Sequence, residues 1–157
     1  MWKKIKSYII PIAIPLIIGG ISSHLIRNNI NIYSQIQKPP LAPHALVFPI
    51  VWGILYALMG YSSGRIYQQR KKSPDLVLDA LLAYAIQLIV NFFWSILFFN
   101  MQDFLLSFIW LVFLWVLIVV MIYRFYKVDP IAALLQIPYL LWVTFAGYLN
   151  LAIYYLN

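Results

Sequence analysis

Five long apolar stretches fill most of this chain and constrain its fold more than any other feature. An α-helix needs about 20 mostly apolar residues to cross the hydrocarbon core of a bilayer. The stretches cover approximately 7–26, 46–66, 76–99, 104–123 and 131–154. A transmembrane β-barrel would instead show alternating segments of about ten residues. The sequence therefore predicts an all-α membrane protein, a bundle of five transmembrane helices that forms a single domain over residues 1–157.

The composition supports a membrane location and excludes several kinds of chemistry. Apolar residues make up 64% of the chain and charged residues only 10%, against about half and about a quarter in soluble domains. The net charge of +7 comes from basic residues between the apolar runs, so a membrane is favoured as the partner and no nucleic-acid partner is expected. Since cysteine is absent, disulfides and thiolate sites are excluded.

The segment boundaries carry helix-start signals. Ser73, Pro74 and Asp75 offer an N-cap, a first-turn proline and an early acid. Asp129 and Pro130 repeat this pattern before the fifth segment, and "NMQD" (100–103) predicts a tight turn between the third and fourth. We interpret the acids as helix caps and not as catalysts; all four lie near predicted helix starts: Asp75, Asp79, Asp103 and Asp129.

Positive charge predicts the orientation. Five spans place the termini on opposite sides, and nine of the 11 Lys and Arg residues fall on the side of the N-terminus. Only Arg27 and Lys38 fall on the other side. Cytoplasmic loops are enriched in basic residues, so we expect a cytoplasmic N-terminus and an external C-terminus, in a bacterial cell membrane. The first segment could be a signal peptide, but its length favours an uncleaved helix.

The first loop, residues 27–43, is the only long connection. Pro39, Pro40 and Pro43 restrict its backbone. Two interpretations are open, a stiff connector or a lid over a cavity between the helix ends. In the preceding span, Gly19, Gly20, Ser22 and Ser23 are small enough to permit close contact with another helix, including that of a second copy.

The third segment contains "QLIVNFFWSILFF", in which Gln87, Asn91 and Ser95 recur every four residues. At helical spacing they share one face with Trp94. A carboxamide without a partner in hydrocarbon costs about 2–7 kcal/mol, so this face should point into the bundle. It either joins helices, at about 0.6 kcal/mol per hydrogen bond, or lines a cavity with polar groups.

Two other segments offer similar faces. Trp52 and Tyr56 align in the second, and Pro138, Trp142 and Ala146 form a stripe in the fifth that can extend to Asn150. Pro138 predicts a kink, because it cannot donate to the carbonyl of Leu134. Indoles beside small or polar residues suit an apolar small-molecule pocket. His24 and His44 are isolated, so no metal site is expected.

Three stretches together identify a resemblance: "KPPLAP…VWGILYALMG", "NFFWSILFF" and "ALLQIPYLLWVTFAGYLNLAIYYLN" resemble the TspO/MBR family. This family comprises bacterial tryptophan-rich sensory proteins and the mitochondrial translocator protein, also called the peripheral benzodiazepine receptor. The resemblance implies five tightly packed helices, commonly in a homodimer, with a cavity closed by the first loop. The implied ligands are protoporphyrin IX, haem-related tetrapyrroles, cholesterol, isoquinoline carboxamides and benzodiazepines. No cofactor is required, because a porphyrin would be ligand or substrate.

The resemblance also implies a set of ligand-binding residues: Pro43, Trp52, Tyr56, Gln87, Asn91, Trp94, Pro138, Trp142 and Ala146. Light- and oxygen-dependent degradation of protoporphyrin IX is a further implied activity, with Trp52 and Trp142 as participating indoles. Leu41 stands where many relatives have a lid tryptophan, so a weaker grip on porphyrin is expected. The functional hypotheses are a receptor, a porphyrin-degrading enzyme and a transporter of porphyrins or lipids, the last without a visible inverted repeat.

Overall fold

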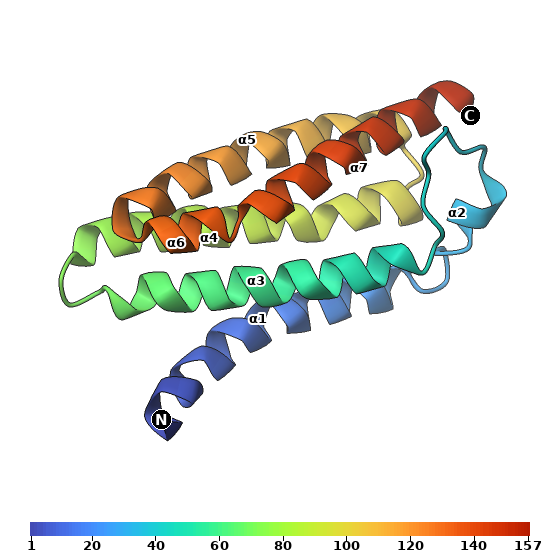
Figure 1. Ribbon diagram of the computed structural model, residues 1–157. Coiled ribbons are helices and arrows are strands. Elements are labelled where there is room, and N and C mark those ends of the chain that lie inside the picture. Colours follow the sequence, from blue (N-terminus) through green and yellow to red (C-terminus); the bar gives the residue numbers. More distant parts are fainter.

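A computed structural model describes residues 1–157, and it contains no β-strand. Five helical segments are long and apolar enough to cross a membrane, as predicted. The helices are α1 (Trp2–Ile26), α2 (Ile32–Gln35), α3 (Val47–Gln68), α4 (Pro74–Ser95), α5 (Phe104–Val128), α6 (Pro130–Leu134) and α7 (Ile137–Leu156), with a π-helical turn, η1 (Ile96–Asn100), after α4. Figure 1 shows an elongated bundle with the N- and C-termini at opposite ends.

The helices pair along the chain. α4 and α5 form the hairpin expected from the "NMQD" turn, α5 packs on α7, and α1 packs mainly on α3. Gly60 makes the α1–α3 crossing close, because a Cβ atom at this position would collide with the backbone of Ile12 and Pro11. The buried core includes Met59, Ile118, Met121, Phe125 and Tyr139.

The fourth span is longer than predicted. The apolar run ends near residue 123, yet α5 continues to Val128. Arg124 forms an ion pair with Asp79 at 2.8 Å, and the ammonium group of Lys127 lies 4.4 Å from the centroid of the Tyr123 ring. The long side chains of Arg124 and Lys127 carry their charged groups away from the apolar region. The helix can therefore continue beyond the apolar run.

The fifth span is interrupted near the predicted kink. α6 ends at Leu134, and α7 begins at Ile137 with Pro138 in its first turn. Because Pro138 has no N–H for the carbonyl of Leu134, a single continuous helix would leave that carbonyl without its intrahelical partner. The chain instead restarts the helix at a position that tolerates proline.

The acids act at helix starts and in ion pairs. Asp103 accepts a hydrogen bond from the Leu106 amide at the start of α5, and Asp129 accepts hydrogen bonds from the first amides of α6. Asp75 lies in the first turn of α4. Ser73 occupies the N-cap position of α4, as predicted, although its side chain makes no capping hydrogen bond.

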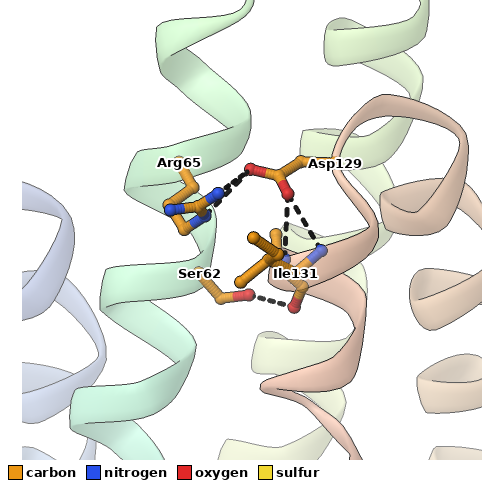
Figure 2. Close-up of polar contacts among 5 residues, drawn as sticks. Ser62, Arg65, Asp129 and Ile131 are labelled. Atoms are coloured by element: carbon orange, nitrogen blue, oxygen red, sulfur yellow. Dashed lines mark hydrogen bonds and ion pairs between the residues drawn. The ribbon is translucent and has the colours of Figure 1, made fainter.

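Asp129 also joins two helices at the end of the bundle that carries the N-terminus. Arg65 of α3 donates from Nε and Nη2 to Oδ2 of Asp129, each at 2.8 Å. Beside this pair, the hydroxyl of Ser62 donates to the carbonyl of Ala132. Figure 2 shows Arg65 and Ser62 reaching from α3 toward the same turn. We refer to Ser62, Arg65, Asp129 and Ala132 as the α3–α6 clamp, because these contacts fix α6 against α3.

Candidate functional site: an aromatic cavity beneath the first loop

A cavity of about 330 Å³ lies at the opposite end of the bundle, where the first loop and the C-terminus meet. Residues of α1, α3, α4, η1 and α7 line it, together with six residues from the connection between α1 and α3: Ile30, Asn31, Tyr33, Ser34, Ala45 and Leu46. Pockets for small molecules are commonly about 300–1,000 Å³. The cavity therefore has the size and mostly apolar lining of a ligand site.

Aromatic side chains of α3, α4 and η1 line the cavity. On α3, Trp52 and Tyr56 lie one turn apart, with ring centroids at 5.5 Å and ring planes inclined by 30°. On α4 and η1, Trp94 and Phe98 repeat this arrangement at 5.5 Å and 31°. Phe48, one turn before Trp52, also lines the cavity. Two inclined pairs of rings thus offer π-surfaces on which a flat ligand can stack.

A chain of polar groups leads from this wall into the bundle. The hydroxyl of Tyr56 donates to Oδ1 of Asn91 at 3.0 Å, and Nδ2 of Asn91 donates to the Tyr139 hydroxyl at 2.7 Å. The Tyr139 hydroxyl in turn donates to Oε1 of Gln87 at 2.8 Å. All four side chains are buried. Asn91 therefore joins α3, α4 and α7 and also lines the cavity. The two roles considered for this helical face, joining helices and lining a cavity, are thus combined in one residue.

A second carboxamide lies across the cavity. Nε1 of Trp94 donates to Oδ1 of Asn150 at 3.1 Å, and Nδ2 of Asn150 donates to the carbonyl of Phe104 at 2.7 Å. Asn150 lines the cavity on α7 together with Ala146, one turn earlier. These contacts fix the orientation of the Trp94 indole.

The small residues of α1 make contacts within the chain. Gly19 lines the cavity, and a Cβ atom there would overlap the ring of Tyr56. Ser22 forms a hydrogen bond with Ser95 through their hydroxyl groups. By contrast, a Cβ atom at Gly20 would meet nothing within 4 Å. Gly19 and Ser22 thus allow α1 to approach the aromatic wall closely.

The first loop is fastened over the cavity by several hydrogen bonds. The buried hydroxyl of Tyr33 donates to the carbonyl of Pro43 at 2.8 Å. Tyr148 of α7 donates to the carbonyl of Pro40 at 2.9 Å. The C-terminal Asn157 side chain bonds both the amide and the carbonyl of Gln37, at 2.9 and 3.0 Å. The loop is thus tied to the last helix, a geometry that favours the lid interpretation over a simple connector.

Two features of the loop bear on its chemistry. Burial raises the pKa of Tyr33 above its usual value of 10.0, so its hydroxyl remains a hydrogen-bond donor at neutral pH.

Leu41 has a positive φ of 71° and is 81% exposed. This side chain lies outside the set that lines the cavity, although relatives were expected to place a lid tryptophan there.

The comparison with known sequences decides the family. Residues 11–156 match the TspO/MBR family. The chain belongs to the TspO/MBR family. It is 39% identical over 125 residues to the tryptophan-rich protein TspO of Chlorobaculum tepidum, and the aligned region covers 80% of this chain and 78% of that protein. It is 33% identical to protein CrtK of Rhodobacter capsulatus, with 80% and 78% covered, and 34% identical to the translocator protein of Bos taurus, with 75% and 70% covered.

Family membership and the five spanning helices identify an integral membrane protein and confirm the resemblance drawn from the sequence. Five of the predicted ligand-binding residues meet at the cavity of this TspO/MBR protein: Trp52, Tyr56, Asn91, Trp94 and Ala146. Four lie outside its wall: Pro43, Gln87, Pro138 and Trp142.

The four outlying residues have other contacts. The Trp142 ring lies 5.8 Å from that of Phe48, in an edge-on arrangement, and its buried Nε1 has no partner in the protein. Gln87 receives the hydrogen bond of Tyr139, the carbonyl of Pro43 in the first loop receives that of Tyr33, and Pro138 is exposed in the first turn of α7.

Sequence analysis did not assign several residues that line the cavity of this TspO/MBR protein. Examples are Ser22, Tyr33, Phe48 and Phe98. Phe48 and Phe98 were detectable, because each lies four residues from a predicted tryptophan on the same helical face. Ser22 carried no comparable signal, since it reaches the cavity through helix pairing. Tyr33 is recognisable only as an aromatic residue of the first loop, and the folding of that loop brings it to the cavity.

Proposed function

We propose that this TspO/MBR protein is a membrane receptor for flat, hydrophobic ligands, with tetrapyrroles such as protoporphyrin IX as the main class. The observation that carries the proposal is the convergence of two indoles and two carboxamides on one apolar cavity, namely Trp52, Trp94, Asn91 and Asn150. The "tryptophan-rich sensory protein" of Cereibacter sphaeroides, 32% identical to this chain, supports a sensory role by its name. Isoquinoline carboxamides, benzodiazepines and sterols belong to the same proposed ligand range.

The proposed binding mode follows from the spare capacity of the polar groups. A carboxamide has two acceptor lone pairs and two N–H donors, and the hydrogen bonds of Asn91 use one of each. Its remaining capacity can orient a polar edge of the ligand, while the aromatic face stacks on Trp52 or Trp94. The lid would then close over the ligand and slow its release.

We further propose that the cavity faces the outer side of the membrane. The N-terminus, the α3–α4 connection and the α5–α6 connection lie together at the other end of the bundle (Figure 1). Nine of the 11 basic residues belong to that end, which the positive-inside rule assigns to the cytoplasm. A ligand would therefore enter from the outside or from the outer leaflet.

Titration of the purified protein with protoporphyrin IX tests the receptor proposal, with the absorbance of the porphyrin as the readout. We expect Trp52→Phe and Trp94→Phe each to weaken binding about 10-fold, in the range for aromatic contacts at binding sites. Trp115→Phe is the matched control, because Trp115 is exposed and binds Thr144 away from the cavity. Equal affinity in the wild type and in both cavity variants would contradict the site.

The same preparation can detect porphyrin degradation. Trp52 lies on the cavity wall and contacts the Tyr56 and Tyr139 rings, with centroids at 5.5 and 6.2 Å. If the protein promotes oxidation of the bound porphyrin by oxygen under light, a new absorbing product will form in the wild type and not in Trp52→Phe at equal porphyrin loading. An unchanged rate without oxygen would exclude this chemistry.

Transport is the alternative function, in line with the name "translocator protein" of several relatives. It would require a path past the α3–α6 clamp, which holds the far end of the bundle. Porphyrin flux into sealed proteoliposomes tests it directly. Tight binding without flux favours the receptor, whereas flux that depends on Trp52 favours the transporter.

A further inference from the structure

A second hollow, of about 930 Å³, lies between α1, α3 and α4, apart from the aromatic cavity. Its apolar side chains are partly open to the surroundings: Ile10 is 69% exposed and Ile89 is 59% exposed. Figure 1 shows the N-terminal half of α1 inclined to the rest of the bundle, where Tyr8 stacks on Tyr61 of α3. α1 is held against α3 near Gly60, so a groove remains on its α4 side. Because these walls face the region of the lipid tails, we refer to this hollow as the lipid-facing groove.

The groove has the length of a lipid tail. It follows α1 from Lys6 to Ile21, a distance of about 22 Å at the rise of an α-helix. This is longer than half of the roughly 30 Å hydrocarbon core. Leu88 and Phe92 of α4 form part of the opposite wall. A mostly apolar groove of this length suits an extended acyl chain.

One end of the groove is basic. Lys6 and Arg70 both line it, beside the polar side chains of Ser7 and Gln68. Neither cation has an acidic partner, since the two ion pairs of the protein are Arg65–Asp129 and Arg124–Asp79. This end also carries the N-terminus, on the side where anionic lipid headgroups attract basic residues.

We propose that the lipid-facing groove binds an anionic phospholipid. The headgroup phosphate lies between Lys6 and Arg70, and one acyl chain lies between α1 and α4. Charge complementarity selects this occupant over a neutral lipid, because two unpaired cations lie where the headgroup of the inner leaflet would be. The lipid-facing groove is separate from the aromatic cavity, so the lipid-binding proposal does not depend on the receptor function.

Native mass spectrometry of the protein released from nanodiscs tests the charged end. The nanodiscs would contain equal amounts of phosphatidylcholine and phosphatidylglycerol. We expect the wild type to retain phosphatidylglycerol preferentially, and Lys6→Ala/Arg70→Ala to reduce that preference about 30-fold, or about 5-fold for each basic residue. The matched control is Lys71→Ala/Lys72→Ala, which removes the same charge outside the groove. Equal losses in both double variants would overturn the site.

A groove-filling variant tests the acyl-chain part. Ala85 is exposed and lines the groove, so Ala85→Trp should abolish lipid retention. Ile86→Trp, on the adjacent exposed face and outside the groove, should leave it unchanged. Equal lipid retention by both variants would contradict the proposal. It would also be contradicted if the wild type formed a dimer without bound lipid and Ala85→Trp dissociated that dimer. The dimer would instead identify a second copy of the chain as the occupant.

Discussion

The two ends of the bundle are held together by different kinds of interaction. At the N-terminal end, the α3–α6 clamp joins helices through an ion pair, a helix cap and a hydroxyl–carbonyl bond. At the cavity end, the helices meet through neutral amides, phenols and indoles, such as Asn91 and Trp94. A buried charge has to keep its partner, whereas a neutral amide can retain spare donors and acceptors. The difference suggests a fixed end and an end that can exchange contacts with a ligand.

Asp129→Ala should give the largest effect and should act on stability alone. It removes the cap of α6, which is worth about 1 kcal/mol. It also leaves Arg65 without its ion-pair partner. That loss should cost less than the 3–5 kcal/mol of a fully buried pair, because the Arg65 side chain is 25% exposed. We expect a loss of about 3 kcal/mol in unfolding free energy, measured in detergent. Porphyrin affinity should change little.

Two controls refine this prediction. Asp129→Asn preserves a good capping residue and should lose less stability than the alanine variant. Asp79→Ala breaks the other ion pair, whose carboxylate side chain is 53% exposed, and should cost less than about 1 kcal/mol. If Asp79→Ala proved as damaging as Asp129→Ala, the clamp would have no special role.

Asn91→Ala should affect both stability and binding. It leaves the Tyr56 and Tyr139 hydroxyls without their Asn91 partners, and an unsatisfied buried group costs about 1–3 kcal/mol. We expect a stability loss of about 2 kcal/mol, together with weaker porphyrin binding. Thermal unfolding and porphyrin titration of the same sample separate the two effects. Normal affinity in a destabilised variant would reduce Asn91 to a structural link between helices.

Gly19→Ala should reduce binding more than stability. The added Cβ would overlap the Tyr56 ring, so that ring must turn within the cavity wall. We expect a loss of affinity of about 10-fold, equivalent to about 1.4 kcal/mol. Gly20→Ala is the matched control, because its Cβ would meet open space. Identical porphyrin affinities of the two variants would show that α1 does not shape the site.

Loosening the lid should give the smallest effect. Asn157→Ala and Tyr148→Phe remove exposed hydrogen bonds between the first loop and α7, each worth about 1 kcal/mol. We expect a few-fold faster release of porphyrin in stopped-flow experiments and a loss of about 1 kcal/mol or less in unfolding free energy for each bond removed. Slower release in either variant would contradict a closing role for the loop.

The pH dependence of the lid follows from Tyr33. Its pKa is raised above 10.0 by burial, so the neutral phenol is favoured in the folded protein. The stabilisation from the Tyr33–Pro43 bond should therefore be complete below pH 10 and be lost as the pH rises through the higher pKa of the folded state. Release rates measured between pH 6 and pH 9 should be constant, apart from ionisation of the ligand itself.

Helical periodicity predicted the direction of the site residues but not their depth. Gln87 lies one turn below Asn91, and Trp142 one turn below Ala146, on the same predicted faces. The cavity occupies only the outer part of the bundle, so Asn91 lines it and Gln87 packs inside. Trp142 is only partly buried and packs against Phe48, beside the cavity wall. The apolar runs, by contrast, were long enough to predict all five spans directly.

The π-helical turn at Ile96–Asn100 was beyond sequence reasoning. Its bonding pattern is visible in the Met101 amide, which donates to the carbonyl of Ile96 five residues earlier. The side chain of Asn100 bonds Asn29 and the carbonyl of Leu25 beyond α4. These tertiary contacts accompany the wide turn, and nothing in the local sequence "ILFFN" distinguishes it from an ordinary helix.

That wide turn gives the protein a place to vary its specificity. A π-turn contains one residue more than the α-helical turn it replaces, so deletion of one residue there would restore regular winding and change which side chains of the turn face the cavity, while the flanking segments keep their orientation. Phe98 would then present a different surface to the cavity, while α5 could remain where it is. Evolution could in this way exchange one aromatic wall for another without rebuilding the bundle.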